Sequence, residues 1–175
     1  LLLRDRGKAM QNAVPTGIGG MIAILGSEIE IIKNALIENK DNFSCYIAND
    51  NSNGQVVVSG EITELKKFEI DLNKKQIKFV RLPVSAPFHC PLMKNATLDM
   101  RQKIINSNFT KPYVEIISNV SASSLNDPEI IKKLLIDQIE KPVRWRESII
   151  KMINLNINNF IEIGPGKVLS GLVKR

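Results

Sequence analysis

The order of apolar segments between residues 15 and 84 constrains the possible folds of this chain more than any other feature. Short apolar runs bounded by turn residues predict strands, and apolar residues recurring every three or four positions predict helices. One helix is predicted after Ser27, which we expect to cap it, and a second carries Leu65, Phe68 and Leu72. The predicted strands are residues 21–25, 43–48, 55–59 and 76–82. The resulting order, βαββαβ, is that of a split βαβ unit, the ferredoxin-like arrangement.

The run NDNSNG at residues 49–54 separates the second and third predicted strands. Asn, Asp, Ser and Gly are the residues that turns favour. We therefore expect Asn49 and Asn51 to lie on a loop.

The rest of the chain alternates differently. Residues 1–14 are predicted to be the end of a helix, and helices are also predicted to start at Asp127-Pro128 and to span residues 145–153. The apolar run at residues 111–120 predicts a strand buried on both faces, and residues 160–163 predict another strand. Strands that alternate with such helices predict a parallel sheet covered on both faces. We expect an α/β protein in which residues 1–14 and 85–175 form one part and residues 15–84 an inserted unit.

The composition is ordinary for a soluble globular protein, with 43% hydrophobic and 24% charged residues. No apolar run is long enough for a bilayer span, and two cysteines are too few for a disulfide framework, so we expect a reducing, cytoplasmic location. Residues 15–84 carry 8 Lys and Arg against 9 Asp and Glu, whereas the remainder carries 16 against 9. The basic part suggests an acidic partner, which is a phosphorylated ligand, an acidic protein or a nucleic acid. Aromatic residues make up only 5% of the chain, which disfavours nucleic acid.

The single histidine, His89, is the main candidate for chemistry. Pro91 fits the first turn of a helix whose apolar residues, beginning at Leu92, recur every four positions. His89 would then lie beside a helix N-terminus, where the partial positive charge favours a neutral imidazole that can accept a proton. The alternative is a histidine that is simply hydrogen-bonded in the core.

Two polar residues fall on apolar helix faces. Arg6 lies on the apolar stripe of residues 1–14, so its guanidinium must meet an anion or reach the surface. Gln138 shares a face with Ile131 and Leu135 near a helix end, where it or the neighbouring carbonyls need a hydrogen-bond partner.

Several kinds of site are not supported. The side chains of His89 and Cys90 are adjacent and diverge, which disfavours a cysteine–histidine pair, and no G-x-S-x-G nucleophile elbow is present. The GPGK run at residues 164–167 lacks the glycine spacing of a phosphate loop. One histidine and two distant cysteines make a metal site improbable.

Five motifs taken together resemble the malonyl-CoA:acyl carrier protein transacylase family of bacterial fatty acid synthesis. They occur in that family's order and spacing over essentially the whole chain, and are RDRGKAMQNAVPTGIGGMIAILG, NDNSNGQVVVSG, LPVSAPFHCPLMKNA, DQIEKPVRW and FIEIGPGKVLSGL. The resemblance implies an α/β-hydrolase-like core that carries a ferredoxin-like subdomain, with the catalytic cleft between them. It also implies malonyl-CoA as substrate, acyl carrier protein as partner, a monomer, and no cofactor, metal or nucleic acid.

The resemblance also implies roles for individual residues. His89 would be the general base and Gln138 would supply the hydrogen-bond acceptor for its second nitrogen, while Arg6 would bind the malonate carboxylate. Asn49 and Asn51 match positions near the cleft, although turn formation alone would explain them.

The phenylalanine directly before His89, Phe88, resembles the residue found at this place in malonyl-selective acyltransferases. A phenyl ring there would leave less room for the extra methyl group of a methylmalonyl substrate. One methyl group changes the binding free energy in a pocket by only ~1–3 kcal/mol, so the selectivity would be partial.

Two motifs of this family, the Gly-Gln-Gly-Ser-Gln loop and the Gly-His-Ser-Leu-Gly nucleophile segment, are not in the sequence. We therefore expect the chain by itself to be inactive and to be part of a longer enzyme. Three alternatives remain open: an acyltransferase domain of a polyketide synthase, a non-catalytic fragment that binds carrier protein, and a basic module that binds nucleic acid. The last is disfavoured because the ferredoxin-like part is close to neutral.

Overall fold

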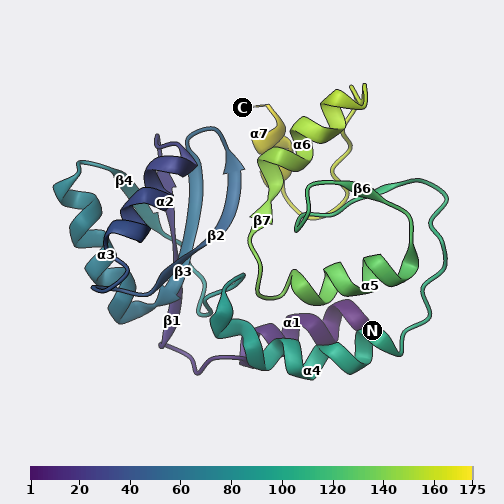
Figure 1. Ribbon diagram of the computed structural model, residues 1–175, viewed down its shortest axis with the longest axis horizontal. Helices are drawn as coiled ribbons and strands as arrows, with labels where there is room; N and C mark the ends of the chain where they lie inside the picture. Colours follow the sequence, from purple (N-terminus) through teal and green to yellow (C-terminus); the bar gives the residue numbers. More distant parts are fainter. Residues whose placement is uncertain (175) are drawn as a thin grey trace.

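The computed structural model describes residues 1–174 (Figure 1). The helices are α1 (Leu2–Asn12), α2 (Ile29–Glu38), α3 (Ile62–Lys74), α4 (Lys94–Ile105), α5 (Pro128–Asp137), α6 (Trp145–Asn154) and α7 (Val168–Val173), and a 3-10 turn at Pro91–Met93 precedes α4. The strands are β1 (Gly19–Leu25), β2 (Cys45–Ser52), β3 (Gln55–Glu61), β4 (Lys78–Arg81), β5 (Ile116–Ile117), β6 (Ser124–Leu125) and β7 (Val143–Arg144). In residues 1–174, no helix combines the length and the apolar character that a bilayer crossing requires.

The main sheet has the strand order β4-β1-β3-β2-β7. The first four strands pair antiparallel and have the ferredoxin-like order, whereas β7 adds to β2 in parallel. The predicted ferredoxin-like unit and the mixed α/β class are confirmed. The boundaries of the two predicted parts remain a prediction.

Alternation along β1 explains how the sheet is covered. Ile22 and Ile24 are fully buried against α2 and α3, where they pack with Phe68 and other apolar residues. Met21 and Ala23 point to the opposite face, because successive side chains of a strand alternate, and there they form a smaller apolar cluster. Strand β1 is therefore buried on both faces.

The second group of elements is built on α1, α4 and α5, which lie together in Figure 1. Ala96, Met100 and Ile104 recur every four residues on α4 and are buried in the core of this group. The predicted apolar face of the helix after His89 is therefore confirmed. Phe88 packs against both this core and the cluster on the second face of the sheet, and so connects the two groups.

Two local predictions are wrong. Strand β2 continues to Ser52, so Asn49 and Asn51 lie in a strand rather than on a loop. The segment keeps its pairing with β3 through two irregularities in register, and long-range pairing outweighs the turn preference of its residues. Ser27 is buried but is not the cap of α2, which begins at Ile29 after Glu28.

The two strands predicted outside the ferredoxin-like unit are largely not formed. Within residues 1–174, the run 111–120 forms a strand only at Ile116–Ile117, which pairs with β6, and residues 160–163 form none. A strand needs a hydrogen-bonding neighbour to form a sheet. In the described part of the chain, the only such neighbour for these two runs is the short strand β6, which pairs with Ile116–Ile117. The side chains of Tyr113, Ile161 and Ile163 are accordingly exposed.

A close contact between β1 and the segment before His89 yields a testable prediction. A Cβ atom added at Gly19 would lie 2.2 Å from Cδ of Pro87, two residues before His89. Because the proline ring cannot move away, Gly19→Ala is expected to lower the free energy of unfolding by about 1–3 kcal/mol. Urea unfolding monitored by circular dichroism measures this change.

The next residue provides the matched control. A Cβ atom at Gly20 would meet Leu65 Cδ1 at 3.4 Å, an ordinary contact. Gly20→Ala is therefore expected to leave stability unchanged or slightly increased, since alanine loses less backbone entropy than glycine on folding. Equal effects of the two variants would contradict the proposed role of the contact with Pro87.

Candidate active site

His89 lies in the connection between β4 and the 3-10 turn at Pro91–Met93. Its backbone is in the left-handed region, with φ of 59°. A residue other than glycine in that region costs of order 1–3 kcal/mol, and such strain clusters at functional sites. Neighbouring Cys90 is buried and donates a hydrogen bond from Sγ to the carbonyl oxygen of Pro87 at 3.1 Å, which stabilises the turn.

Nδ1 of the His89 imidazole lies 2.8 Å from the backbone carbonyl oxygen of Gln138. A carbonyl oxygen can only accept a hydrogen bond, so Nδ1 carries the proton. In the neutral ring Nε2 is then unprotonated and can accept a proton. The structure therefore brings His89 and Gln138 together in the geometry that a general base requires.

Three influences act on the pKa of His89. Burial is the largest and lowers the pKa below its usual 6.5, the hydrogen bond to the Gln138 carbonyl raises it, and the charge of Arg6 lowers it. The net effect is a neutral imidazole at pH 7. Lys33 of α2 and Glu140, which follows α5, line the same cavity as the ring.

Arg6 lies on α1, half-buried and close enough for its charge to affect His89. Its Nε atom is buried and has no hydrogen-bond partner among residues 1–174. Burial lowers the pKa of the guanidinium from its usual value, although arginine remains protonated at any physiological pH. A buried cation whose donor is unused needs an anion to offset the loss of hydration, so Arg6 is suited to bind an anionic group.

The positions of these two residues predict a change in the pKa of His89. Arg6→Met removes the neighbouring positive charge, so the pKa of His89 is expected to rise towards 6.5. A proton NMR titration of the imidazole measures the change directly. Arg4→Met removes the same charge from an exposed position on the same helix and is the matched control. An equal shift in both variants, or none in Arg6→Met, would contradict the assignment.

The lowered pKa also affects stability. Below about pH 6.5 the unfolded chain protonates its histidine while the folded protein resists protonation at His89. The unfolded state then binds more protons, so this contribution to stability is complete above that pH and is lost as the pH falls.

Gln138 is held by a second residue that sequence analysis did not identify. Its side-chain Nε2 donates to Oδ1 of Asn119 at 3.1 Å. The backbone carbonyl of Asn119 accepts from the backbone N–H of Arg144 at 2.8 Å. The only sequence signal was that Asn119 is a polar residue near the end of a predicted strand. The hydrogen bond joins positions 19 apart in the chain, so a local pattern does not indicate it.

The other predicted residues are not gathered around His89. Asn51 lines a cavity of about 500 Å³ between α2, the end of β2 and α6, whereas His89 lines a separate one of about 420 Å³. Asn49 pairs with Val143 of β7. Phe88 is half-buried and packs in the apolar core.

An ion pair that the sequence did not reveal joins β2 to α6. The side chain of Asp50, only 3% exposed, accepts from Arg146 of α6, with Nη2 at 2.8 Å and Nε at 3.0 Å from Oδ2. It lies between Asn49 and Asn51 on β2, and so fixes this part of the strand against α6. The partners are 96 positions apart, which puts the pair beyond prediction from local patterns.

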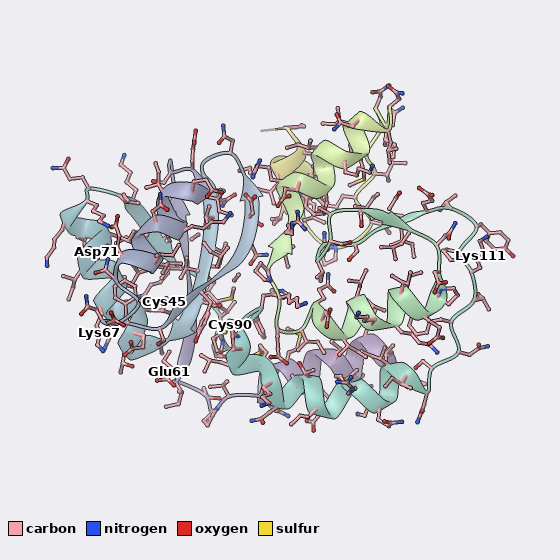
Figure 2. All side chains as sticks on the ribbon, viewed as in Figure 1. Cys45, Glu61, Lys67, Asp71, Cys90 and Lys111 are labelled. Atoms are coloured by element: carbon pink, nitrogen blue, oxygen red, sulfur yellow. The ribbon has the colours of Figure 1, made fainter. Side chains whose placement is uncertain are left out.

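The two cysteines, which are labelled in Figure 2, line the same cavity as His89. Burial raises the pKa of the Cys45 thiol to about 12 and also raises that of Cys90. Both thiols are therefore neutral at pH 7 and poor nucleophiles. No group of three His, Cys, Asp or Glu side chains in residues 1–174 is arranged to hold a metal ion.

Comparisons with known proteins agree on one family. A family model described as acyl transferase domain matches residues 2–175. A malonyl CoA-acyl carrier protein transacylase from Bacillus subtilis (strain 168) is 40% identical over 175 residues, which cover 99% of this chain and 55% of that protein.

Solved structures are equally similar. The transacylase of that name from Clostridium perfringens matches with a TM-score of 0.94 and 38% identity, over 99% of this chain and 55% of that one. A malonyl transacylase in complex with a type II polyketide synthase acyl carrier protein matches with a TM-score of 0.93 and 35% identity, over 99% of this chain and 57% of that one. This chain thus spans little more than half the length of the relatives it matches.

Proposed function

Because the chain belongs to the acyl transferase domain family, we propose that it is the part of a malonyl transferase that carries the general base and the carboxylate-binding arginine. The whole enzyme would transfer the malonyl group from malonyl-CoA to the phosphopantetheine thiol of acyl carrier protein, in fatty acid biosynthesis. A serine nucleophile outside this sequence would carry the group between the two thiols.

The reaction would proceed in two similar steps. In the first, Nε2 of His89 takes the proton of the serine hydroxyl while its oxygen attacks the thioester carbonyl, and the proton then passes to the departing CoA thiol. In the second, the thiol of the carrier protein attacks the malonyl-serine ester, with His89 accepting the thiol proton and returning it to the serine oxygen. The enzyme is thereby regenerated with no net change in protons.

The observation that carries this proposal is the 2.8 Å contact between His89 Nδ1 and the Gln138 carbonyl oxygen. It orients the ring and fixes its tautomer, the task that a buried aspartate performs in Ser-His-Asp triads. Burial and the charge of Arg6 keep the pKa of His89 below its usual value despite this hydrogen bond, so the base stays unprotonated at pH 7.

Arg6 would select the substrate. Its unpartnered Nε and buried position suit a bidentate pair with the free carboxylate of a malonyl group, which an acetyl group does not have. The substrate site would lie between two parts of the chain. One part would be formed by residues 1–14 and 85–175, and the other by residues 15–84. Phe88, Asn49 and Asn51 would contribute to the walls of this site.

The excess of basic residues outside residues 15–84 would assist the encounter with an acidic carrier protein, chiefly by increasing the rate of association. We further propose that the enzyme is a cytoplasmic monomer.

Intact mass spectrometry tests the function. The complete protein that contains this sequence is incubated with malonyl-CoA, and is expected to gain the mass of one malonyl group and to lose it when carrier protein with a free phosphopantetheine thiol is added. A protein that folds and binds carrier protein but never gains the group would instead be a non-catalytic binding fragment.

Similarity to the transacylase that was solved with a polyketide synthase carrier protein supports a second candidate, the supply of malonyl groups to polyketide synthesis. The same experiment distinguishes the two candidates when carrier proteins of both kinds are compared. The preferred acceptor would lose its free thiol faster at equal concentration.

A further inference from the structure

We propose that Asn119 is a positioning residue for the base, acting through Gln138 to hold the carbonyl that orients His89. The inference rests on the proposed function only in assigning His89 as the base. The orientation of the imidazole itself can be tested without substrate.

The first step is the position of the Gln138 carbonyl at the end of a helix. Gln138 is the residue that follows α5, and its backbone N–H still bonds to the Leu134 carbonyl at 2.9 Å. The carbonyls of a last helical turn have no partner within the helix. The direction of the Gln138 carbonyl is therefore set by what holds the residue from outside.

Asn119 supplies that constraint. Its Oδ1 accepts from Gln138 Nε2 at 3.1 Å, while the carbonyl of Gln138 faces His89 Nδ1 at 2.8 Å. The two bonds hold opposite ends of one half-buried residue, so rotation of Gln138 would break both of them. Positioning within about 0.5 Å is what a catalytic hydrogen bond requires.

Asn119 is itself held firmly. Its backbone carbonyl accepts from the Arg144 N–H at 2.8 Å, and the following residue, Val120, accepts from Arg144 Nη1 at 3.3 Å. The guanidinium of Arg144 is fixed in turn by Glu147, with Nε at 2.8 Å from Oε1. A continuous series of hydrogen bonds thus leads from α6 to the imidazole, and each donor in it has a matching acceptor.

A purely structural role for Asn119 makes a different prediction. If Asn119 only stabilised the turn after Ser118, Asn119→Ala would lower the free energy of unfolding but leave the ring of His89 unchanged. Positioning requires that the same substitution change the tautomer of His89.

The experiment uses the complete protein labelled with ¹⁵N-histidine, with His89 assigned by comparison with His89→Asn. The chemical shifts of the ring nitrogens near pH 8 report the tautomer, and kcat and KM for malonyl-CoA are measured on the same samples. Asn119→Ala removes the acceptor, and Asn119→Asp retains an oxygen that can accept from Gln138 Nε2.

We expect His89 in the wild-type protein to carry its proton on Nδ1. In Asn119→Ala a substantial fraction should carry it on Nε2, and kcat should fall about tenfold with little change in KM. Asn119→Asp should restore the wild-type tautomer. Adding Asn119→Ala to Gln138→Ala should cause no further loss, since both remove the same bond.

An unchanged tautomer in folded Asn119→Ala would overturn the inference, whatever happens to stability. If Asn119→Ala does not fold, Gln138→Ala removes the other end of the bond while keeping the carbonyl, and the same outcomes apply to it. If the tautomer changes but the wild-type protein never accepts malonyl, the positioning role stands and the proposed function fails.

Discussion

Replacing His89 with asparagine is expected to lower kcat for malonyl transfer by about 10²- to 10⁴-fold, the usual contribution of a general base. Asparagine tolerates the left-handed backbone of residue 89 better than most residues, and its amide can still donate to the Gln138 carbonyl. The substitution therefore removes the basic nitrogen while disturbing the turn as little as possible. Single-turnover transfer from malonyl-CoA to the enzyme measures the effect.

The control for this variant is its stability. The free energy of unfolding of His89→Asn at pH 8 should be close to that of the wild-type protein, so that a lost rate is not a lost fold. A kcat within threefold of the wild-type value would mean that another group removes the serine proton, and the assignment of His89 as base would be wrong.

Arg6→Met is expected to abolish the preference for malonyl over acetyl groups. Removing one partner of a buried, charge-assisted pair costs about 2–5 kcal/mol, so kcat/KM for malonyl-CoA should fall by about 30- to 4,000-fold. The value for acetyl-CoA should hardly change, because an acetyl group has no carboxylate for Arg6 to bind. Competition between the two thioesters, followed by mass spectrometry of the acyl-enzyme, measures the ratio directly.

Arg4→Met is again the matched control, because it removes a positive charge from an exposed position of the same helix. It should leave the malonyl-to-acetyl ratio unchanged. Parallel losses for both substrates in Arg6→Met would show that the arginine supports the fold of α1 or the chemistry itself, rather than substrate selection.

Much of the fold was predictable from local patterns. The βαββαβ order follows from periodicity alone, since Ile22 and Ile24 alternate on β1 and Leu65, Phe68 and Leu72 share a face of α3. The helix predicted to start at Asp127-Pro128 is α5, and the structure adds that Asp127 Oδ1 caps it by accepting from the backbone N–H groups of Glu129 and Ile130. These features depend on residues close together in the sequence.

The failures have a common cause in long-range pairing. Asn49 and Asn51 favour turns, but β2 is extended by its pairing with β3 and β7. The strands predicted at residues 111–120 and 160–163 need neighbours that the described residues supply only to β5.

The candidate site was predictable in its residue types but not in its contacts. A lone histidine, an arginine on an apolar stripe and a glutamine at a helix end pointed to His89, Arg6 and Gln138. The structure joins His89 to the Gln138 carbonyl, and the charge of Arg6 lowers the pKa of His89. Their catalytic roles remain predictions. The hydrogen bond to Asn119 joins residues from segments with no common periodicity, so no pattern in the sequence indicates it.

The position of β7 restricts how the two groups of elements can move. Val143 and Arg144, which follow α5 in the chain, pair with Asn49 and Asp50, so the segment that leaves the second group is joined to the main sheet. Sliding along the boundary between the groups would shift the register and break these hydrogen bonds, as well as the pair between Asp50 and Arg146. A small twist about β2 would keep them. We therefore expect the junction to act as a torsional hinge that permits rotation of the groups and resists shear.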